Sequence, residues 1–561
     1  MFITWGALVN RASIQLIEAA LLLPSAGYIL FRRPNWPPRL LRIEKAFRQI
    51  AHHKSMSTVA VGAAAIVLRA IVIPILKIPL PATHDEFSYL LAGDTFAHGR
   101  WTNPPHPMWI HFETYHVLQH PTYMSMYMPG QGLILALGQL LGHPWIGVLL
   151  TTGLMCSAIC WMLQAWVPPE WALFGGLLAV LRLGILSYWA NTYWGGSLAA
   201  FGGALVLGAL PRIKRTCRVR DSLLMAAGVV ILANTRPYEG FIFGLTIAAG
   251  MLPWLMRKFQ TVPRLTLARF VAPMATFLVL GGAVTSYYLF RVTGSAFELP
   301  QLLNRSTYSR SKYFVWQEPR PAPVYHHAIM EKFYNMELQY FQEGRTIAGF
   351  VRHEAEKVEL FWLFFLGPAF TIPLLSFPQV VSDRRMRFPL FAGAVFIMGL
   401  VVEVWTAPHY IAPATGLLYL VLVQCLRHLR LWEWKQRPVG AALVWSVPVL
   451  FCVMITIRLA AVVAGARIEN PWPRGNLARA QIEHTLENTE GEQLVLVRYS
   501  ELHSPLDEWV YNLSDIDRQK VVWARDLGAA DNHELLEYYA NRKAWLLEPD
   551  ESPVKLVPIE N

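Results

Sequence analysis

Long apolar runs separated by short polar loops dominate the hydrophobic pattern of the chain. Because a helix needs roughly 20 apolar residues to cross a bilayer, the pattern predicts about eleven membrane-spanning helices, or about twelve if the first run crosses. That first run, 12–31, is marginal because Gln15, Glu18 and Pro24 interrupt it. The other predicted spans cover residues 58–78, 144–166, 171–190, 197–210, 223–234, 241–255, 271–290, 358–377, 389–405, 411–426 and 439–463.

The basic residues between these runs predict the orientation of the chain. Residues 32–54, 212–220 and 427–437 are densely basic, which is typical of loops on the cytoplasmic side of a membrane. Alternation then places two long polar loops, 79–130 and 291–356, on the extracytoplasmic side. The apolar run 129–142, at the end of the first of these loops, is too short to cross, so we expect it to lie at the interface or to re-enter the membrane.

The last part of the chain, residues 465–561, has no predicted span. Its pattern indicates helices at 477–487 and 532–541 and strands at 493–499, 520–525 and 544–547, which is typical of a small α/β domain. The predicted fold is therefore an all-α polytopic membrane protein with a small extracytoplasmic α/β domain. Three parts are expected: an N-terminal apolar segment and basic loop (1–57), a transmembrane core (58–464) and the soluble domain (465–561).

Composition agrees with a membrane protein. Of the 561 residues, 54% are hydrophobic and only 16% are charged. The net charge of +11 lies mostly in the short loops, so it predicts orientation and not a nucleic-acid partner. Of the five cysteines, four lie in apolar runs and Cys217 lies in a basic loop, so no disulfide framework is expected. The first apolar run lacks a small-residue cleavage site and is not expected to be a cleaved signal.

Two adjacent carboxylates follow the second apolar run almost at once. Asp85 and Glu86 would stand at the boundary between water and lipid, and on a helix their side chains would point about 100° apart, so only one can face a given cleft. A carboxylate in that position could accept the proton of an acceptor hydroxyl or amine. The alternative is that both residues only cap a helix, since acids favour helix N-termini.

The surrounding motif resembles the GT-C glycosyltransferase superfamily, in particular the branch with protein O-mannosyltransferases, aminoarabinose transferases and galacturonosyltransferase-like proteins. The residues that carry the resemblance are Asp85, Glu86, Tyr89, Gly99, Pro104, Pro105, Tyr127 and Pro129. The resemblance implies a GT-C-like fold, Asp85 as the catalytic base, inversion at the anomeric carbon, and transfer from a polyprenyl-phosphate-linked sugar outside the cytoplasm. Glu86 is the second predicted catalytic residue, which would orient the acceptor or hold the site. Many relatives have Lys-Pro-Pro where this chain has Met128-Pro129-Gly130, so a cation expected near the donor phosphate is missing.

Other predicted outer turns offer candidate substrate-binding residues. Arg236, in the sequence TRPYEG, could grip a phosphate, or it could form an internal ion pair with Glu239. His409 and Tyr410, in TAPHY, resemble a family turn that faces the lipid donor, or they belong to an interfacial aromatic belt. The turn 191–196 (NTYWGG) is a further candidate. With the first-loop residues, the predicted substrate-binding set is Tyr89, Glu113, His116, Tyr127, Arg236, Glu239, His409 and Tyr410.

The histidines of the first loop raise the question of a metal. His111, Glu113, His116 and His120 are residue types that bind divalent ions, but they form no fixed ligand motif. We therefore predict no metal site and no certain cofactor, with a divalent metal as an open alternative.

The sequence thus favours a glycosyltransferase of a bacterial-type inner membrane, with a polyprenyl-phosphate-sugar donor, a glycan, lipid or protein acceptor and the bilayer as its partners. The alternative from another class is a transporter or lipid-binding scaffold without catalysis. Arg69 and Arg182 support that alternative, because both lie near the middle of predicted spans. Most polar candidates lie in outer loops instead, and we find no inverted repeat of the kind common in transporters.

Overall fold

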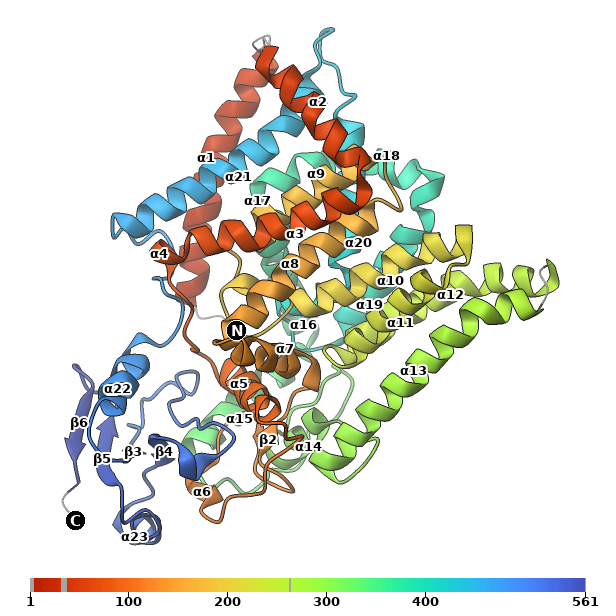
Figure 1. The fold of residues 1–561 in the computed structure, drawn as a ribbon. Helices are drawn as coiled ribbons and strands as arrows, with labels where there is room; N and C mark the ends of the chain where they lie inside the picture. Colours follow the sequence, from red (N-terminus) through yellow and green to blue (C-terminus); the bar gives the residue numbers. More distant parts are fainter. Residues whose placement is uncertain (1–4, 32–37, 262–263, 560–561) are drawn as a thin grey trace.

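The computed structural model describes residues 5–31, 38–261 and 264–559. A bundle of helices forms most of the molecule, and the strands of the C-terminal part lie beyond one end of it, beside the two long loops (Figure 1). The bundle contains α1 (Trp5–Phe31), α2 (Pro38–His52), α3 (Lys54–Ile71), α4 (Ile73–Leu76), α7 (Pro129–Leu140), α8 (Pro144–Leu163), α9 (Pro169–Ala179), α10 (Ser197–Thr216), α11 (Val219–Ala233), α12 (Pro237–Thr261), α13 (Arg264–Thr293), α16 (Ile347–Phe361), α17 (Gly367–Thr371), α18 (Phe377–Ser382), α19 (Arg387–Val402), α20 (Thr415–Leu429) and α21 (Val439–Val463).

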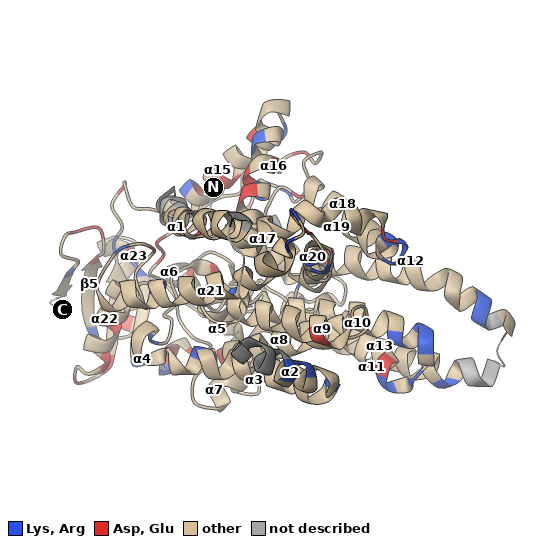
Figure 2. Ribbon diagram, turned by 90° about the horizontal axis from the view of Figure 1, so that it is seen from above, with Lys and Arg blue, Asp and Glu red and all other residues tan. Residues whose placement is uncertain are grey.

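The protein is a multi-pass membrane protein. Within the described residues, eight helices are long and apolar enough to cross a bilayer. A ninth span is present if the helix pair Ile347–Thr371 and Pro373–Ser382, bent by 78°, counts as one. The eight are Lys54–Ile71, Pro144–Leu163, Ser197–Thr216, Pro237–Lys258, Ala268–Thr293, Arg384–Val402, Ala412–Leu429 and Val439–Val463. Figure 2 marks Lys and Arg residues on α2 and at the joined ends of α12 and α13.

The remaining predicted spans are helical but short or broken. The apolar part of α1 covers 17 residues (Ser13–Ile29), and α11 has 15 residues. The run 171–190 begins as α9 and then widens into a π-helical turn, Val180–Gly184. The run 358–377 is interrupted in the same way at Trp362–Leu366. Hydropathy does not reveal such breaks, because the residues in them are apolar except for Arg182.

Polar side chains within the bundle form hydrogen bonds to backbone groups where the helices are interrupted. Arg182 donates to the carbonyl oxygens of Leu363 (2.7 Å) and Phe364 (3.1 Å), inside the second π-helical turn. Glu18 accepts from the amide of Ala369 at 2.9 Å and lies 3.7 Å from Arg182. Because water cannot reach these groups in a bilayer, the side chains replace the missing helical bonds. Arg182 therefore has a structural role.

The first long loop is folded. It contains α5 (His84–Ala97), α6 (Trp109–Phe112) and the antiparallel strands β1 (Val117–Leu118) and β2 (Met124–Ser125). The second long loop contains α14 (Pro300–Tyr308) and α15 (Ala328–Gly344). A buried aromatic cluster that includes Tyr115 and Phe333 joins the two loops, and the hydroxyl of Tyr115 donates to the carbonyl of Ile329 at 2.9 Å.

The C-terminal part is the predicted α/β domain with one extra strand. Its elements are α22 (Leu477–Glu487), β3 (Gln493–Val497), β4 (Val521–Arg525), α23 (Ala529–Tyr538), β5 (Lys543–Glu548) and β6 (Lys555–Pro558). The sheet order is β4-β3-β5-β6; β3 pairs in parallel with β4 and β5, and β6 pairs antiparallel with β5. The edge strand β6 was not predicted, because it is only four residues long and half-exposed.

This domain packs against the first loop through buried polar contacts. Arg525 donates to the backbone carbonyl of Glu113 at 2.7 Å, and its own carbonyl lies 3.1 Å from Nδ1 of His111. The amide of Ser514 donates to Asp94 on α5 at 3.0 Å. Buried groups that bond across two segments fix the relative position of both. The domain therefore supports the loop that carries the candidate site.

Candidate active site

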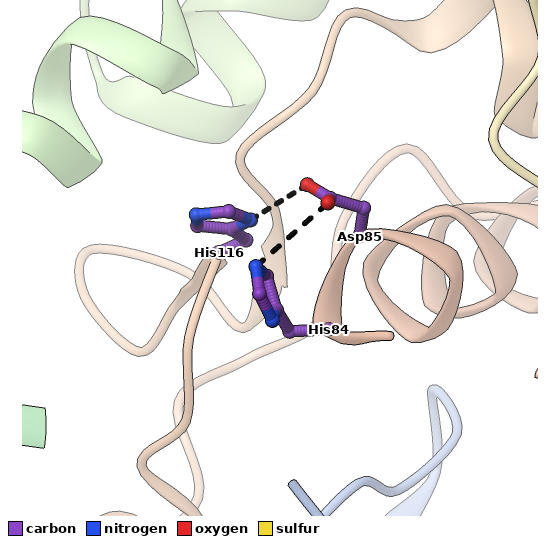
Figure 3. Close-up of side chains that lie close together, drawn as sticks. All are labelled: His84, Asp85 and His116. Atoms are coloured by element: carbon purple, nitrogen blue, oxygen red, sulfur yellow. Dashed lines mark hydrogen bonds and ion pairs between the residues drawn. The ribbon is translucent and has the colours of Figure 1, made fainter. Parts of the chain in front are cut away.

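Asp85 stands at the first turn of α5, and the imidazoles of His84 and His116 lie at its carboxylate (Figure 3). Nδ1 of His116 lies 2.8 Å from Oδ1 of Asp85, and the hydroxyl of Tyr127 donates to the same oxygen. Nε2 of His84 lies 3.7 Å from Oδ2. The side chain of Asp85 remains 21% exposed, so the carboxylate is held firmly and can still be approached.

Glu86, the neighbouring acid, caps the helix. Its Oε2 accepts from the amides of Ala82 (2.9 Å) and Thr83 (3.3 Å), and its Oε1 accepts from the amide of Tyr193 (2.9 Å). With Thr83 it forms a capping box at the start of α5. The side chain is buried. Of the two acids, Asp85 faces the polar cluster, and Glu86 holds the helix start and the turn at Tyr193 in place.

The environment separates the ionisation of the two acids. Burial raises the pKa of Asp85, but the charges of His116 and His84 and the hydrogen bonds from His116 and Tyr127 outweigh it and hold this pKa well below its usual range. Burial raises the pKa of Glu86 to about 7, even though three backbone amides act in the opposite direction. The environment therefore favours the ionised form of Asp85 and the protonated form of Glu86.

The backbone of the loop places His116 opposite Asp85. His116 has a positive φ of 58°, which few residues other than glycine adopt. Its carbonyl accepts from the hydroxyl of Ser88 on α5 (2.7 Å) and from the amide of Met126 (3.0 Å). These bonds tie the strained position to α5 and to the strand pair, so the imidazole is held in place before any substrate binds.

A pair of stacked tyrosine rings lies beside Asp85, within the electrostatic influence of Arg236. Tyr127 stacks on Tyr89 with ring centroids 4.3 Å apart. Burial raises the pKa of Tyr89 to about 12, while the positive charge of Arg236 lowers it. The Arg236 guanidinium lies 4.6 Å from the ring centroid of Tyr410 and 3.8 Å from the carboxylate of Glu239. Arg236 thus has the internal ion pair that the sequence left open, and it also borders the tyrosines beside Asp85.

Gly130 brings the TRPYEG turn against the first loop. Its amide donates to the carbonyl of Asn234 at 2.8 Å, and a Cβ added at Gly130 would lie 2.6 Å from that oxygen and 2.6 Å from the Thr235 side chain. A proline here has no amide hydrogen and would not fit. The departure from Lys-Pro-Pro therefore has a structural reason: glycine allows the close approach that sets Arg236 beside the loop.

The other two predicted turns reach the same region. Nδ1 of His409 lies 3.0 Å from the hydroxyl of Tyr188, and its ring centroid lies 5.3 Å from that of Trp194. The indole of Trp194 donates to Thr83 at 2.6 Å, directly before α5. Burial lowers the pKa of His409 well below its usual value, and the charge of Arg236 lowers it further while Asp85 raises it. The four sequence segments therefore surround one site.

Glu113 belongs to a separate cluster. It is buried, and it accepts from the hydroxyl of Tyr308 (2.8 Å) and lies 3.0 Å from Nδ1 of His326. These partners belong to the second long loop. The structure therefore gives Glu113 a role in joining the two loops and does not place it with Asp85.

The predicted metal-ligand candidates do not gather either. His111 contacts the carbonyl of Arg525, and His120 packs its ring against Trp109. Among the described residues, a different group has the spacing for a metal ion: ligand atoms of His84, Asp85 and His116 lie within 4.8 Å of one another. Two imidazoles and a carboxylate suit zinc and similar divalent ions. His84 also has a buried Nδ1 without a hydrogen-bond partner.

Sequence reasoning did not include His84, Trp194 or Phe333 among the site residues. Phe333, on α15, packs its ring 5.2 Å from that of His84 and 5.9 Å from that of His116. His84 stands next to the acid pair, and Trp194 lies in a turn that was noted for its glycines, so both had a sequence signal. Phe333 lies more than 200 residues from the first loop, and nothing in its local pattern indicates this contact.

No protein-family model matches the chain, and no curated protein matches it in sequence. Several solved structures are similar, and two of them are an oligosaccharyltransferase and ArnT. The Archaeoglobus fulgidus oligosaccharyltransferase in the apo form has a TM-score of 0.48 and 11% identity, over 88% of this chain and 69% of that one. ArnT from Cupriavidus metallidurans bound to undecaprenyl phosphate has a TM-score of 0.47 and 15% identity, over 87% of this chain and 92% of that one.

Both proteins belong to the GT-C superfamily, which the motif of residues 84–130 resembles. Both TM-scores lie below 0.5 and both identities below 25%, so the functional proposal rests on this chain's own residues.

Proposed function

We propose that this protein is an integral-membrane glycosyltransferase that moves a sugar from a polyprenyl-phosphate donor to an acceptor hydroxyl or amine on the extracytoplasmic face. The observation that carries the proposal is the ionised Asp85 carboxylate, oriented by His116 and Tyr127 where four turns of the chain meet. Such a transfer needs two groups: a carboxylate that acts as the base, and a cation that binds the phosphate leaving group.

Asp85 accepts the acceptor's proton in this proposal. The acceptor oxygen or nitrogen attacks the anomeric carbon from the face opposite the donor phosphate. The bond between that carbon and the phosphate oxygen breaks, and its electron pair leaves with the polyprenyl phosphate. A carboxylate with a depressed pKa is a weak base. It suffices because the attacking atom becomes strongly acidic as its new bond forms, so the proton moves late to Asp85.

Arg236 receives the phosphate that leaves. Its guanidinium has only a 3.8 Å contact with Glu239, longer than a close ion pair. A phosphate offers two oxygens to the planar guanidinium and is the better partner for it. Tyr89 and Tyr127 stack on each other beside Asp85, and in this proposal their rings border the sugar.

The transporter alternative loses its main support. Arg69 donates to Oδ1 of Asn191 (2.8 Å) and to the carbonyl of Lys77 (2.9 Å), and it lies 4.6 Å from the Trp145 ring. Arg182 likewise bonds to backbone carbonyls of a broken helix. Most polar atoms of both arginines therefore have structural partners, although Nη1 of Arg69 is buried without one.

Comparison of lipid-linked and surface glycans by mass spectrometry tests the proposal. Cells with and without the protein should differ by one sugar on one class of acceptor, and the unused lipid-linked sugar should accumulate in its absence. Reintroduction of the wild-type chain should restore the sugar, whereas the Asp85→Asn variant at equal abundance should not. Identical glycans and lipid-linked sugars in both cell types would reject the transferase assignment.

A further inference from the structure

Two buried side chains of the C-terminal domain contact the backbone of the first loop just before His116. Nε of Arg525, the last residue of β4, donates to the carbonyl of Glu113 at 2.7 Å. The hydroxyl of Tyr511 donates to the carbonyl of Tyr115 at 3.3 Å. Because Tyr115 directly precedes His116, these two bonds fix the backbone that leads into the position with a positive φ.

Tyr511 also contacts the helix that carries Asp85. Its ring stacks on that of Phe87 on α5, with centroids 4.3 Å apart and planes inclined by 7°. Phe87 lies two residues after Asp85, at the same end of the helix. The carbonyl of Tyr511 accepts from Nη2 of Arg479 on α22 at 3.2 Å, which ties the tyrosine to its own domain. One side chain thus contacts both the start of α5 and the residue before His116.

Arg525 is held in place by a buried ion pair. Its Nη2 donates to Oε2 of Glu508 at 2.6 Å, and the two side chains are 4% and 0% exposed. Because a buried charge that loses its partner is strongly destabilising, the guanidinium stays at Glu508 and its Nε stays directed at the carbonyl of Glu113. The side chain of Glu113 in turn accepts from Tyr308 of the second long loop. The segment before His116 is therefore fixed between the C-terminal domain and the second loop.

We propose that Tyr511 and Arg525 are positioning residues for the Asp85–His116 pair, and that they hold the backbone from which the imidazole reaches the carboxylate. A residue other than glycine keeps a left-handed conformation only where the surrounding contacts hold it. Groups of α5 and of the loop bind the carbonyl of His116 itself, and the C-terminal domain binds carbonyls that precede it, so the residue is held from both sides. The two residues act through His116 and not on the substrate, and their effect on turnover rests on the proposed function.

The ¹⁵N resonance of Nδ1 of His116 in the purified full-length protein tests the proposal without any substrate. Its assignment comes from its loss in His116→Asn, and its displacement in Asp85→Asn shows the effect of a broken contact. Tyr511→Phe keeps the stacked ring and removes the hydroxyl. Arg525→Lys keeps the charge but lacks the planar group that binds two partners at once. Both variants should displace the resonance in the same direction as Asp85→Asn.

Matched controls are Tyr538→Phe and Arg498→Lys, which change exposed residues of the same domain. They should leave the His116 resonance at its wild-type position. Tyr511→Phe should keep a Tm near that of the wild type, because it removes only one hydroxyl, so its effect on the resonance does not depend on lost folding.

Turnover tests the consequence for the reaction. Tyr511→Phe and Arg525→Lys should lower kcat by roughly 3–10-fold, the usual effect of one lost hydrogen bond, and should leave KM for the lipid donor unchanged. In the His116→Asn background the same substitutions should have no further effect, because they act through His116.

An unchanged His116 resonance in both folded variants would overturn the proposal, and so would equal losses of kcat in the wild-type and His116→Asn backgrounds. A wild-type protein without transfer activity would reject the proposed function, whereas the resonance would still decide the positioning role of Tyr511 and Arg525.

Discussion

Nδ1 of His116 lies 2.8 Å from Oδ1 of Asp85, although 31 residues separate the two in the chain. The contact joins the first turn of α5 to a loop position with a positive φ, so neither side chain can be placed by local sequence alone. It also decides the charge of the acid: the charge of His116 is the largest of the effects that lower the pKa of Asp85 against the opposing effect of burial.

His116→Asn tests this coupling through pH. Asparagine tolerates the left-handed backbone at this position and removes the positive charge, so the pKa of Asp85 should rise. Transfer needs the ionised carboxylate and is lost as pH falls through that pKa. The acid limb of the pH–rate profile should therefore move upward by about one unit or more.

Tyr127→Phe should move the acid limb in the same direction by removing one hydrogen bond to Asp85. Tyr287→Phe, a half-exposed tyrosine on α13, is the control and should leave the profile unchanged. If the pH–rate profiles of the wild type, His116→Asn and Tyr127→Phe coincide, His116 and Tyr127 do not control the pKa of Asp85, which would contradict this prediction.

Glu86→Gln should act on stability. Burial raises the pKa of Glu86 to about 7. The pKa expected in the unfolded chain is about 4.3. The contribution of this group to the free energy of unfolding is therefore complete below about pH 4.3 and is lost as pH rises through about 7. In the variant this dependence should disappear from Tm measured between about pH 5 and pH 8. Turnover per folded molecule should stay near that of the wild type.

The control for Glu86 is Glu534→Gln on α23, where the side chain is exposed. Its Tm should follow pH as the wild type does. A Glu86→Gln variant that folds normally, keeps the pH dependence of Tm and has no transfer activity would give Glu86 a direct part in catalysis.

Arg236→Ala tests the phosphate site. Loss of a charge-assisted hydrogen bond should raise KM for the lipid donor roughly 10–100-fold, with a smaller effect of Arg236→Lys, whose ammonium cannot grip two oxygens. Arg291→Ala, an exposed arginine at the end of α13, should not change KM. If both Arg236 variants lose thermal stability equally and KM is unchanged in the folded fraction, the role of Arg236 is limited to its ion pair with Glu239.

Labelling tests the proposed orientation. Ser504 is exposed in the C-terminal domain, and Ser382 is exposed at the end of α18 before a basic loop. In a background with Cys217 and Cys452 replaced by serine, a cysteine at Ser504 should react with an impermeant thiol reagent in intact spheroplasts. A cysteine at Ser382 should react only after lysis. The reverse result would place the Asp85 site on the cytoplasmic face.

The apolar pattern predicted most of the helical segments because burial in lipid leaves a continuous signal. It could not predict where helices break. In the sequence, Arg182 is a charged residue in the middle of a predicted span. Its hydrogen-bond partners are the carbonyl groups of Leu363 and Phe364, which lie in the π-helical turn of a segment far away in the chain. The C-terminal helix 477–487 was predicted with its observed bounds, whereas β6 depends on pairing with β5 and has little pattern of its own.

In the candidate site, the residues themselves indicated the acid pair, and only the family resemblance favoured Asp85 over Glu86 as the base. The spacing Thr83 to Glu86 is that of a capping box, and it is a local signal that Glu86 serves the helix start. Glu113 was grouped with His116 because the two are close in sequence, yet its partners Tyr308 and His326 lie in the second long loop. Such pairings depend on how the loops fold onto each other, which residue spacing does not determine.

The most direct test of the central claim is sugar transfer by purified Asp85→Asn supplied with the natural lipid donor and acceptor. Asparagine keeps the shape of the side chain and removes the proton acceptor, so the protein should fold with a Tm near that of the wild type. Turnover should fall by roughly 10²–10⁴-fold, the usual effect of losing a positioned general base. Near-normal turnover of the folded variant would contradict the assignment of Asp85 as the catalytic base.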